Sequence, residues 1–251
     1  MVLFHRVDDR VKGSPLGCGT SEFRAFCTFF ASYFHVIPLS ELLQRARNGG
    51  PLSRCLAITF DDGYRDNYQF AAPILRELGL PASFFVTTRF IGSDITPFWD
   101  REYGVRSWWM GWDEVRDLRD QGFEIGAHTR THASLGRVDR ARAMQEIFGS
   151  REDLERELGA APSLFSFPFG SPDHITEEAR ALVRDAGFDC CLSAEAGGVV
   201  PGSDPFRLRR FAVTPWHRSA AQLGLEMLLP DFRLGPPVSP RLSLEMGIEV
   251  R

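Results

Sequence analysis

The sequence predicts an α/β fold built on parallel strands within one domain that covers residues 1–251. Strand-like and helix-like segments alternate along the chain, which is typical of parallel strands joined by crossover helices. The length of 251 residues suits one barrel-sized domain. Polar clusters directly follow two predicted strands, and chemistry in parallel barrels gathers at the C-terminal ends of strands. Residues 230–251 are rich in Pro and Gly and are expected to form a loosely attached tail.

The first elements are predicted from short apolar runs and helical spacing. Residues 2–5 form an apolar run that predicts the first strand. Residues 21–33 place aromatic side chains at helical spacing, so we expect a helix whose stripe faces the core rather than a cofactor or a membrane. Residues 34–38 are predicted to form a short strand. Ser40 is predicted to cap a helix that runs to Arg47 and ends at a glycine pair.

The middle of the chain combines two strands with a long loop. Residues 55–60 are apolar and β-branched, which predicts a buried strand. The following helix extends to about residue 78 and tolerates Pro73 near its middle at some cost in stability. Residues 83–87 are predicted to form the next strand. The loop over residues 88–111 is long, and loops of this length without their own structure are commonly functional.

The second half continues the alternation. Residues 112–121 are predicted to form a helix that leads to a strand at 124–128. Residues 140–158 carry an apolar stripe among many charges, which predicts a barrel-surface helix with no recognisable chemistry. The remaining elements are a strand at 164–167, a helix from a Thr176 cap to about residue 186, and strands at 189–193 and 206–213.

Composition excludes several classes of protein. The 29 Lys and Arg residues against 33 Asp and Glu give a net charge of -4, so a nucleic-acid partner is not expected. The five cysteines are odd in number and contain no Cys-x-x-Cys, which argues against a disulfide framework and a thiolate zinc site. No apolar run reaches the roughly 18 residues of a membrane span. The first strand follows Met1 directly, so a cytoplasmic protein is expected unless an export segment is missing from the chain. The sequence does not determine the oligomeric state.

Two motifs together predict a metal site with a spare acid/base group. Alone, an Asp-Asp-Gly turn after a strand and two histidines four residues apart are both ordinary features. Together, Asp62, His128 and His132 supply the three ligands that a catalytic divalent ion needs besides an open position. Asp61 cannot easily join the same ion and is left to take a proton from an attacking water. The ligand set suits Zn²⁺ best and is compatible with Co²⁺, Ni²⁺ or Fe²⁺.

The chain resembles the polysaccharide deacetylases of carbohydrate esterase family 4, which share the chitooligosaccharide-deacetylase homology domain. Thr59-Phe60-Asp61-Asp62-Gly63 matches the first motif of that family, and His128-Thr129-Arg130-Thr131-His132 matches the second. Phe167-Pro168-Phe169-Gly170 is a variant of the third. The order and spacing agree from residue 2 to about residue 213. The resemblance implies a distorted (β/α)7 barrel and metal-dependent removal of acetyl groups, usually from N-acetylated sugars.

The third motif departs from the family pattern in two places. By resemblance, the backbone N–H of Phe169 helps to stabilise the oxyanion; the family more often has Tyr there, and an N–H donor survives the change. The family also has an Arg two residues before the proline, where it orients the base, and this chain has Ser166. Arg210 is the proposed substitute. The alternative is that Arg210 is an exposed arginine on an edge strand.

A general acid is also needed, because an amine leaves poorly unless it is protonated. The family usually supplies a histidine from a Leu-x-His near the C-terminus, and this chain lacks that motif. His5 ends a strand that resembles the first strand of the circularly permuted deacetylases of biofilm glucosamine polymers, so His5 is the predicted acid. The alternative is a histidine with only a structural role. His35 and His174 are expected to be structural or surface residues, while His217 can line a substrate groove.

The predicted reaction is hydrolysis of the acetamide of an N-acetylated amino sugar or an amino-sugar-containing metabolite. Because an export signal is not seen, a cytosolic, small substrate is expected, either free or linked to a nucleotide, a lipid or a small metabolite. Trp99, Trp108 and Trp109 can stack on such a sugar or pack under their loop. Two alternatives remain: a hydrolase of non-sugar linear or cyclic amides, and a carbohydrate-binding protein with an idle site. The second requires the loss of a catalytic group, yet all four residues of the first two motifs are present.

Overall fold

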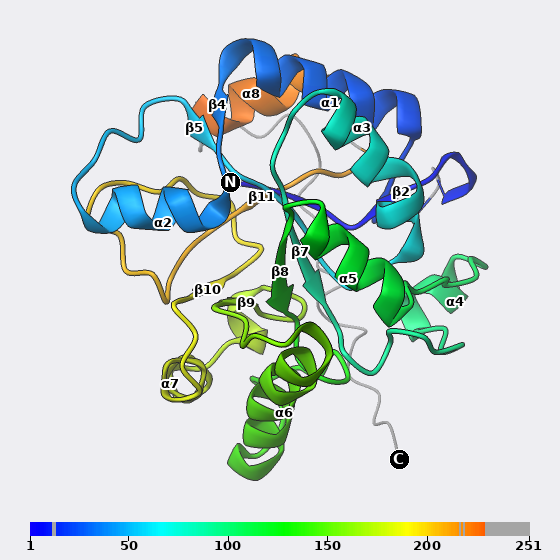
Figure 1. Cartoon of the computed structure of the whole chain (residues 1–251), viewed down its shortest axis with the longest axis vertical. Helices are drawn as coiled ribbons and strands as arrows, with labels where there is room; N and C mark the ends of the chain where they lie inside the picture. Colours follow the sequence, from blue (N-terminus) through cyan, green and yellow to red (C-terminus); the bar gives the residue numbers. More distant parts are fainter. Residues whose placement is uncertain (12–13, 216, 218, 229–251) are drawn as a thin grey trace.

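The protein is built around a seven-stranded sheet in which neighbouring strands run parallel. Figure 1 shows the computed structural model, which describes residues 1–11, 14–215, 217 and 219–228. The strand order is β10-β9-β8-β7-β6-β1-β11. The predicted tail at 230–251 lies outside the described residues. The strands are β1 (Val2–Phe4), β6 (Ile58–Phe60), β7 (Ser83–Val86), β8 (Glu124–Ala127), β9 (Leu164–Ser166), β10 (Cys190–Leu192) and β11 (Phe211–Ala212).

The sheet curls so that residues 208–211 contact both β1 and β10. On one side, Phe211 of β11 pairs with Val2 of β1. On the other side, Leu208 forms a parallel bridge with Leu192 of β10. This segment brings the two ends of the strand order toward each other, and the sheet forms a curled half-barrel. The predicted α/β class and distorted (β/α)7 barrel are confirmed, although the last predicted strand is shorter than expected.

Helices surround the sheet in the order expected for crossover connections (Figure 1). Within the part of the chain that the structure describes, no helix is long and apolar enough to cross a membrane. Short pairs β2 (Arg6–Val7) with β3 (Gly17–Cys18) and β4 (His35–Val36) with β5 (Cys55–Leu56) lie outside the main sheet. The helices are α1 (Thr20–Tyr33), α2 (Leu39–Arg47), α3 (Ala72–Glu77), α4 (Phe98–Glu102), α5 (Trp112–Asp120), α6 (Arg140–Leu158), α7 (Glu177–Asp185) and α8 (Ala220–Leu228), with the short turns η1 (Asp9–Val11), η2 (Asn67–Ala71) and η3 (Pro172–His174).

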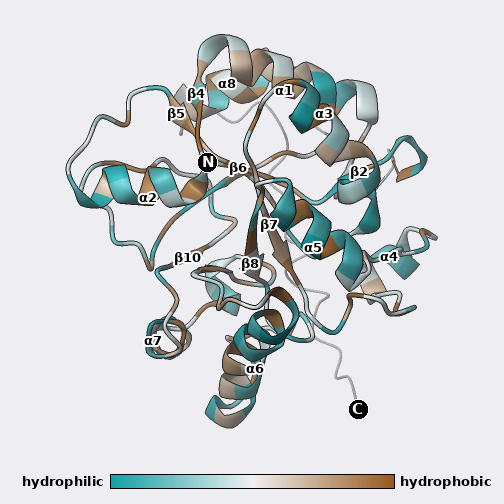
Figure 2. Cartoon of the chain, in the orientation of Figure 1, coloured by the Kyte–Doolittle hydropathy of each residue, from teal (hydrophilic) through white to brown (hydrophobic). Residues whose placement is uncertain are grey.

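Aromatic side chains fill the core between the sheet and α1. The ring of Phe4 on β1 lies 5.0 Å from Phe23 and 5.6 Å from Phe60, and Phe60 stacks on Phe84 at 4.7 Å. Such pairs add stability beyond the apolar area that they bury. Figure 2 shows the hydrophobic colouring of β7 and β8 and the mixed colouring of the helices around them. The core-facing stripe predicted for residues 21–33 is therefore confirmed.

One local prediction is wrong because a distant residue decides the structure, and two other predicted elements are present with local differences. Helix α2 begins at Leu39, and the backbone N–H groups of Leu39 and Ser40 donate to the carboxylate of Glu124 at 2.9 and 3.0 Å, so Ser40 is not the cap. The helix predicted from Gly63 to about residue 78 is present, because helical backbone runs from residue 65 to 77. Its π-helical part η2 precedes Pro73, which lies in the first turn of α3. The short strand predicted at 34–38 is present as β4, which pairs with β5.

Candidate active site

The predicted functional residues follow the ends of neighbouring strands. Asp61 and Asp62 follow β6, His128 follows β8, and His5 follows β1. The strands lie in register: Phe4 pairs with Phe60, so His5 and Asp61 leave the sheet at the same level. Because all seven strands point the same way, these side chains meet at the C-terminal end of the barrel.

The backbone of this region is held in an unusual conformation. Asp62, Thr129, His132 and Phe169 have positive φ angles of 78°, 61°, 60° and 63°. Left-handed backbone disfavours side chains larger than glycine, costs about 1–3 kcal/mol per residue, and clusters at functional sites. Arg54 is the other described non-glycine residue of this kind, with φ 59°. All three motifs therefore contain backbone that the surrounding structure must hold in place.

Asp62, His128 and His132 form a buried group whose ligand atoms all lie within 4.8 Å of one another. The Nε2 atoms of His128 and His132 each lie 3.3 Å from Asp62 Oδ1. Ligands bonded at about 2.0–2.1 Å to a tetrahedral ion lie about 3.3–3.4 Å apart, so these two separations suit such an ion.

The polar atoms around this group also fit a metal ion. Asp62 Oδ1 is buried and has no hydrogen-bond partner in the described structure, which is costly unless a cation or another donor satisfies it. His128 Nδ1 lies 2.9 Å from the carbonyl oxygen of Ser166, so its N–H donates there and leaves the Nε2 lone pair free for a cation. The residues present therefore fit a divalent metal with nitrogen and oxygen ligands.

Asp61 belongs to a separate, fully buried charge cluster. Arg210 grips its carboxylate with two bonds, Nη1 to Oδ1 at 2.8 Å and Nη2 to Oδ2 at 2.7 Å. The five N–H donors of Arg210 are all used, because the remaining bonds reach Ser193 O, Thr59 Oγ1 and Ser166 Oγ. Burial favours the neutral acid, but Arg210 outweighs it and keeps the pKa of Asp61 below its usual value. Arg210 is 0% exposed, so it is not a surface arginine.

Ser166 contacts both Asp61 and Arg210, which directly precedes β11. Its hydroxyl donates to Asp61 Oδ2 at 3.0 Å and accepts from Arg210 Nη2 at 2.7 Å. Its backbone carbonyl accepts the bond from His128. A small residue at this position leaves room for the Arg210 guanidinium and links the two carboxylate environments.

Removal of the Arg210 charge is expected to be strongly destabilising. Arg210→Met leaves the buried carboxylate of Asp61 without its countercharge, which typically costs about 3–5 kcal/mol. Arg207→Met is a matched control, because Arg207 lies in the same segment and forms an exposed pair with Glu177. The free energy of unfolding from urea titration gives the comparison. Equal losses in both variants would contradict the role assigned to the buried pair.

His5 and Phe169 both lie beside residues of the first two motifs. His5 is half-buried, burial lowers its pKa, and the charges of Asp62 and Asp61 oppose that effect. The ring of Phe169 lies 4.6 Å from that of His132. Among the described residues, the Phe169 N–H donates to no other group, which leaves this N–H available to an acceptor.

Of the three tryptophans singled out in the sequence, two are buried and one is exposed. Trp99 and Trp109 are buried; the ring of Trp99 lies 4.6 Å from His132, and that of Trp109 stacks on Tyr64 at 4.5 Å. Both therefore pack under the loop, which is the second of the two alternatives expected from the sequence. Trp108 is 48% exposed, and the guanidinium of Arg106 lies over its ring, 4.3 Å from the ring centre.

His217 and His174, which are not among the predicted metal ligands, have partners elsewhere. His217 Nε2 lies 3.1 Å from Glu226 Oε2 of α8, so this side chain is engaged there rather than free to line a groove. His174 is buried, and its Nδ1 lies 2.7 Å from Ser134 Oγ. The expectation of a structural role therefore agrees with the surroundings of His174.

A buried network that the sequence did not reveal anchors the long loop. Tyr64 OH accepts a bond from Trp99 Nε1 at 2.9 Å and donates to Asp100 Oδ2 at 3.0 Å. Arg6 lies over the Tyr64 ring, 4.5 Å from its centre, and donates to Asp66 at 3.0 Å. The loop at 88–111 contains α4 and is tied to the barrel through this network, which holds Trp99 against a predicted metal ligand.

Comparisons with known proteins agree with the geometry. The profile of the polysaccharide deacetylase family matches residues 48–191. YxkH of Bacillus subtilis, whose name places it among polysaccharide deacetylases, is 23% identical over 217 residues, which are 86% of this chain and 71% of that protein. The poly-beta-1,6-N-acetyl-D-glucosamine N-deacetylase of Staphylococcus aureus is 21% identical over 187 residues, 71% of this chain. The match spans 61% of the length of that relative.

A solved structure supports the same fold. The Streptococcus pyogenes deacetylase PplD, in complex with acetate, superposes with a TM-score of 0.74 at 17% identity and covers 90% of this chain and 96% of that one. At this identity the likeness concerns the fold alone. Because the family profile matches more than half of the 251 residues, the chain belongs to the polysaccharide deacetylase family, the deacetylating hydrolases of carbohydrate esterase family 4.

Proposed function

We propose that the protein is a metal-dependent N-deacetylase that acts on a polymer of N-acetylated amino sugars. The ion is held by Asp62, His128 and His132, with Asp61 as general base and His5 as general acid. Zn²⁺ is the proposed metal, because imidazole and carboxylate ligands in this number suit it. The relatives named as deacetylases of polysaccharide or of poly-N-acetylglucosamine support a polymer rather than the small metabolite expected from the sequence.

One observation carries the proposal: two adjacent carboxylates have different partners. Asp62 faces two imidazoles and keeps a buried oxygen unsatisfied. Asp61 faces a guanidinium and a hydroxyl, and both of its oxygens are engaged. Pairs of acids in different environments take different chemical roles. These surroundings support a ligand role for Asp62 and a proton-transfer role for Asp61.

The residues of this chain then divide the steps of amide hydrolysis. A divalent ion held by Asp62, His128 and His132 would supply Lewis-acid polarisation of the acetyl carbonyl and would make a water easier to deprotonate. Asp61, oriented by Arg210 and Ser166, takes the proton of the attacking water. The free N–H of Phe169 donates to the developing oxyanion. His5 gives a proton to the amine nitrogen as the C–N bond breaks, which yields acetate and a free amino sugar.

The size of the substrate can be tested by rates of acetate release. Oligomers of N-acetylglucosamine with increasing length are expected to be hydrolysed faster than the free monosaccharide, because additional sugar units bind outside the reacting centre. The measurement is kcat/KM against chain length for β-1,6 and β-1,4 oligomers with the zinc-loaded protein. Faster hydrolysis of monomeric or nucleotide-linked acetamido sugars would instead favour the small cytosolic substrate expected from the sequence.

A further inference from the structure

We infer that Glu146 on α6 is a positioning residue of the metal site. Its buried carboxylate holds the loop between His128 and His132 in the shape that brings both imidazoles to Asp62. The inference rests on the proposed function, because the loop has this importance only if its histidines bind an ion. It gives a supporting role to the helix at residues 140–158, in which the sequence shows no recognisable chemistry.

The loop cannot hold its own shape. It contains two left-handed residues, Thr129 and His132, and such conformations persist only where surrounding groups hold them. One side of the loop is fixed by the segment after β7. The backbone N–H of Thr88 donates to Thr129 O at 3.2 Å, and that of Arg89 donates to Arg130 O at 2.8 Å. These bonds satisfy carbonyl oxygens and leave the N–H groups of the loop to find other acceptors.

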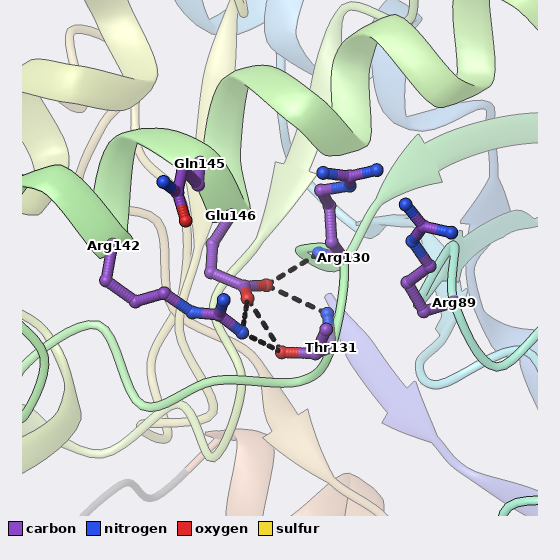
Figure 3. A pocket seen from close by; sticks show the side chains of 6 residues that line it. All are labelled: Arg89, Arg130, Thr131, Arg142, Gln145 and Glu146. Carbon is purple, nitrogen blue, oxygen red and sulfur yellow. Dashed lines mark hydrogen bonds and ion pairs between the residues drawn. The ribbon is translucent and has the colours of Figure 1, made fainter.

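Glu146 supplies the acceptors on the opposite side (Figure 3). Its Oε2 accepts the backbone N–H groups of Arg130 at 2.9 Å and Thr131 at 2.8 Å. Its Oε1 accepts the Thr131 hydroxyl at 2.7 Å and pairs with Arg142 Nη2 at 2.7 Å. Two consecutive N–H groups that point at one anionic oxygen form a concave anion site in the backbone. The carboxylate thus fixes the part of the loop that lies directly before His132.

Hydrogen bonds, rather than packing, hold this part of the loop. A pocket opens on its outer side and is lined by polar residues that include Arg89, Thr131 and Gln145 (Figure 3). Thr131 is exposed, whereas Glu146 is 1% exposed. Thr131 is therefore held by its bonds to Glu146 rather than by burial, whereas the ring of His132 also packs against Trp99 and Phe169.

Asp153, two turns further along α6, holds a side chain of the same loop. Its Oδ2 accepts from Arg130 Nε at 3.0 Å and from Thr88 Oγ1 at 2.8 Å. The carboxylates of Glu146 and Asp153 both lie on the side of α6 that faces the barrel. Helix α6 therefore acts as a support for the second motif, and Glu146 is its contact closest to a ligand.

A carboxylate is required because both of its oxygens must accept. Glu146→Gln keeps the size of the side chain but turns one acceptor into an NH₂ donor. That NH₂ would face either the two backbone N–H groups or the Arg142 guanidinium, and both are donors. The loop would lose one of its fixed points, while the ligands Asp62, His128 and His132 remain present.

The test is the affinity of the purified full chain for Zn²⁺, measured by competition with a chromophoric chelator. Glu146→Gln is expected to weaken binding by about 10–100-fold, the usual effect of removing a group that orients a metal ligand. The visible absorption spectrum of the Co²⁺-loaded protein is expected to change as well, because it reports the geometry of the ligands. Glu152→Gln removes the same charge from an exposed site on the same helix and is expected to match the parent protein.

The outcomes separate this inference from the proposed function. If Glu146→Gln matches Glu152→Gln in Zn²⁺ affinity and Co²⁺ spectrum, Glu146 has only a structural role and the inference is wrong. If Glu146→Gln fails to fold, Thr131→Val decides: it removes the exposed hydroxyl donor, a smaller loss of Zn²⁺ affinity is expected, and an unchanged affinity would overturn the inference. If the parent protein binds neither ion, the proposed function fails first, and the parent and Glu152→Gln both reveal this.

Discussion

Asp61→Asn is expected to retain its metal, whereas its kcat is expected to fall by a factor of about 10²–10⁴. The amide keeps the size of the carboxylate but cannot take a proton from water. Asp62→Ala, His128→Ala and His132→Ala are expected to lose the metal instead, because each removes one of the three proposed ligands. Metal content by elemental analysis, together with acetate release, distinguishes the two kinds of variant.

The fold of each variant must be checked in the same experiment. Asp61→Asn leaves the Arg210 charge without its full partner, so some loss of stability is expected besides the loss of turnover. His217→Ala serves as a control for the histidine variants, because its ring pairs with Glu226 and lies outside the metal group. Full metal occupancy in the His128 and His132 variants would show that these residues are not the ligands.

The fold and the motif residues were predictable because they depend on local patterns. The alternation of strands and helices gave the parallel sheet, and the bounds of helix α6 match the predicted residues 140–158. The ends of β6 and β8 carry Asp62 and His128 as predicted. Because strand ends of a parallel sheet share one edge, short motifs that follow strands can be placed in space from sequence alone.

The supporting residues were harder to predict because their partners lie far away in the chain. The cap of α2 is Glu124, from β8, and no local rule selects it over Ser40. Arg210, 149 residues from Asp61, was proposed as the partner of the base only because the third motif lacks its usual arginine, since the contact itself depends on how the sheet curls. In the sequence, Ser166 was visible only as a departure from the third motif of the family. In the structure, its hydroxyl forms hydrogen bonds with both Asp61 and Arg210. These contacts belong to tertiary structure rather than to any sequence window.

The role of α6 could have been suspected from its spacing. Glu146, Ser150 and Asp153 recur every three or four residues beside the buried apolar stripe, so they share its side of the helix. A charged residue on a buried helix face requires a partner. The sequence could therefore predict that Glu146 is paired, but it could not predict that the partner is the backbone of the second motif.

His5→Ala is expected to lower the rate of amide hydrolysis by roughly 10²–10⁴, the usual contribution of a positioned general acid. Apart from the predicted metal ligands, His5 is the described histidine whose charge interacts with both Asp61 and Asp62. It leaves β1 at the level where Asp61 leaves β6. Metal content should not change, because His5 is outside the ligand group. His35→Ala, at an exposed position on β4, is the matched control.

The leaving group distinguishes an acid from a residue that only shapes the site. An amine must be protonated as it departs, whereas the phenolate of an aryl acetate leaves without a proton. His5→Ala should therefore impair hydrolysis of an N-acetylated sugar far more than hydrolysis of 4-nitrophenyl acetate by the same zinc-loaded protein. Equal losses on the two substrates would assign His5 a structural role. Amide activity close to that of His35→Ala would mean that the proton reaches the amine from another group, and the likeness to the circularly permuted deacetylases would then not extend to the acid.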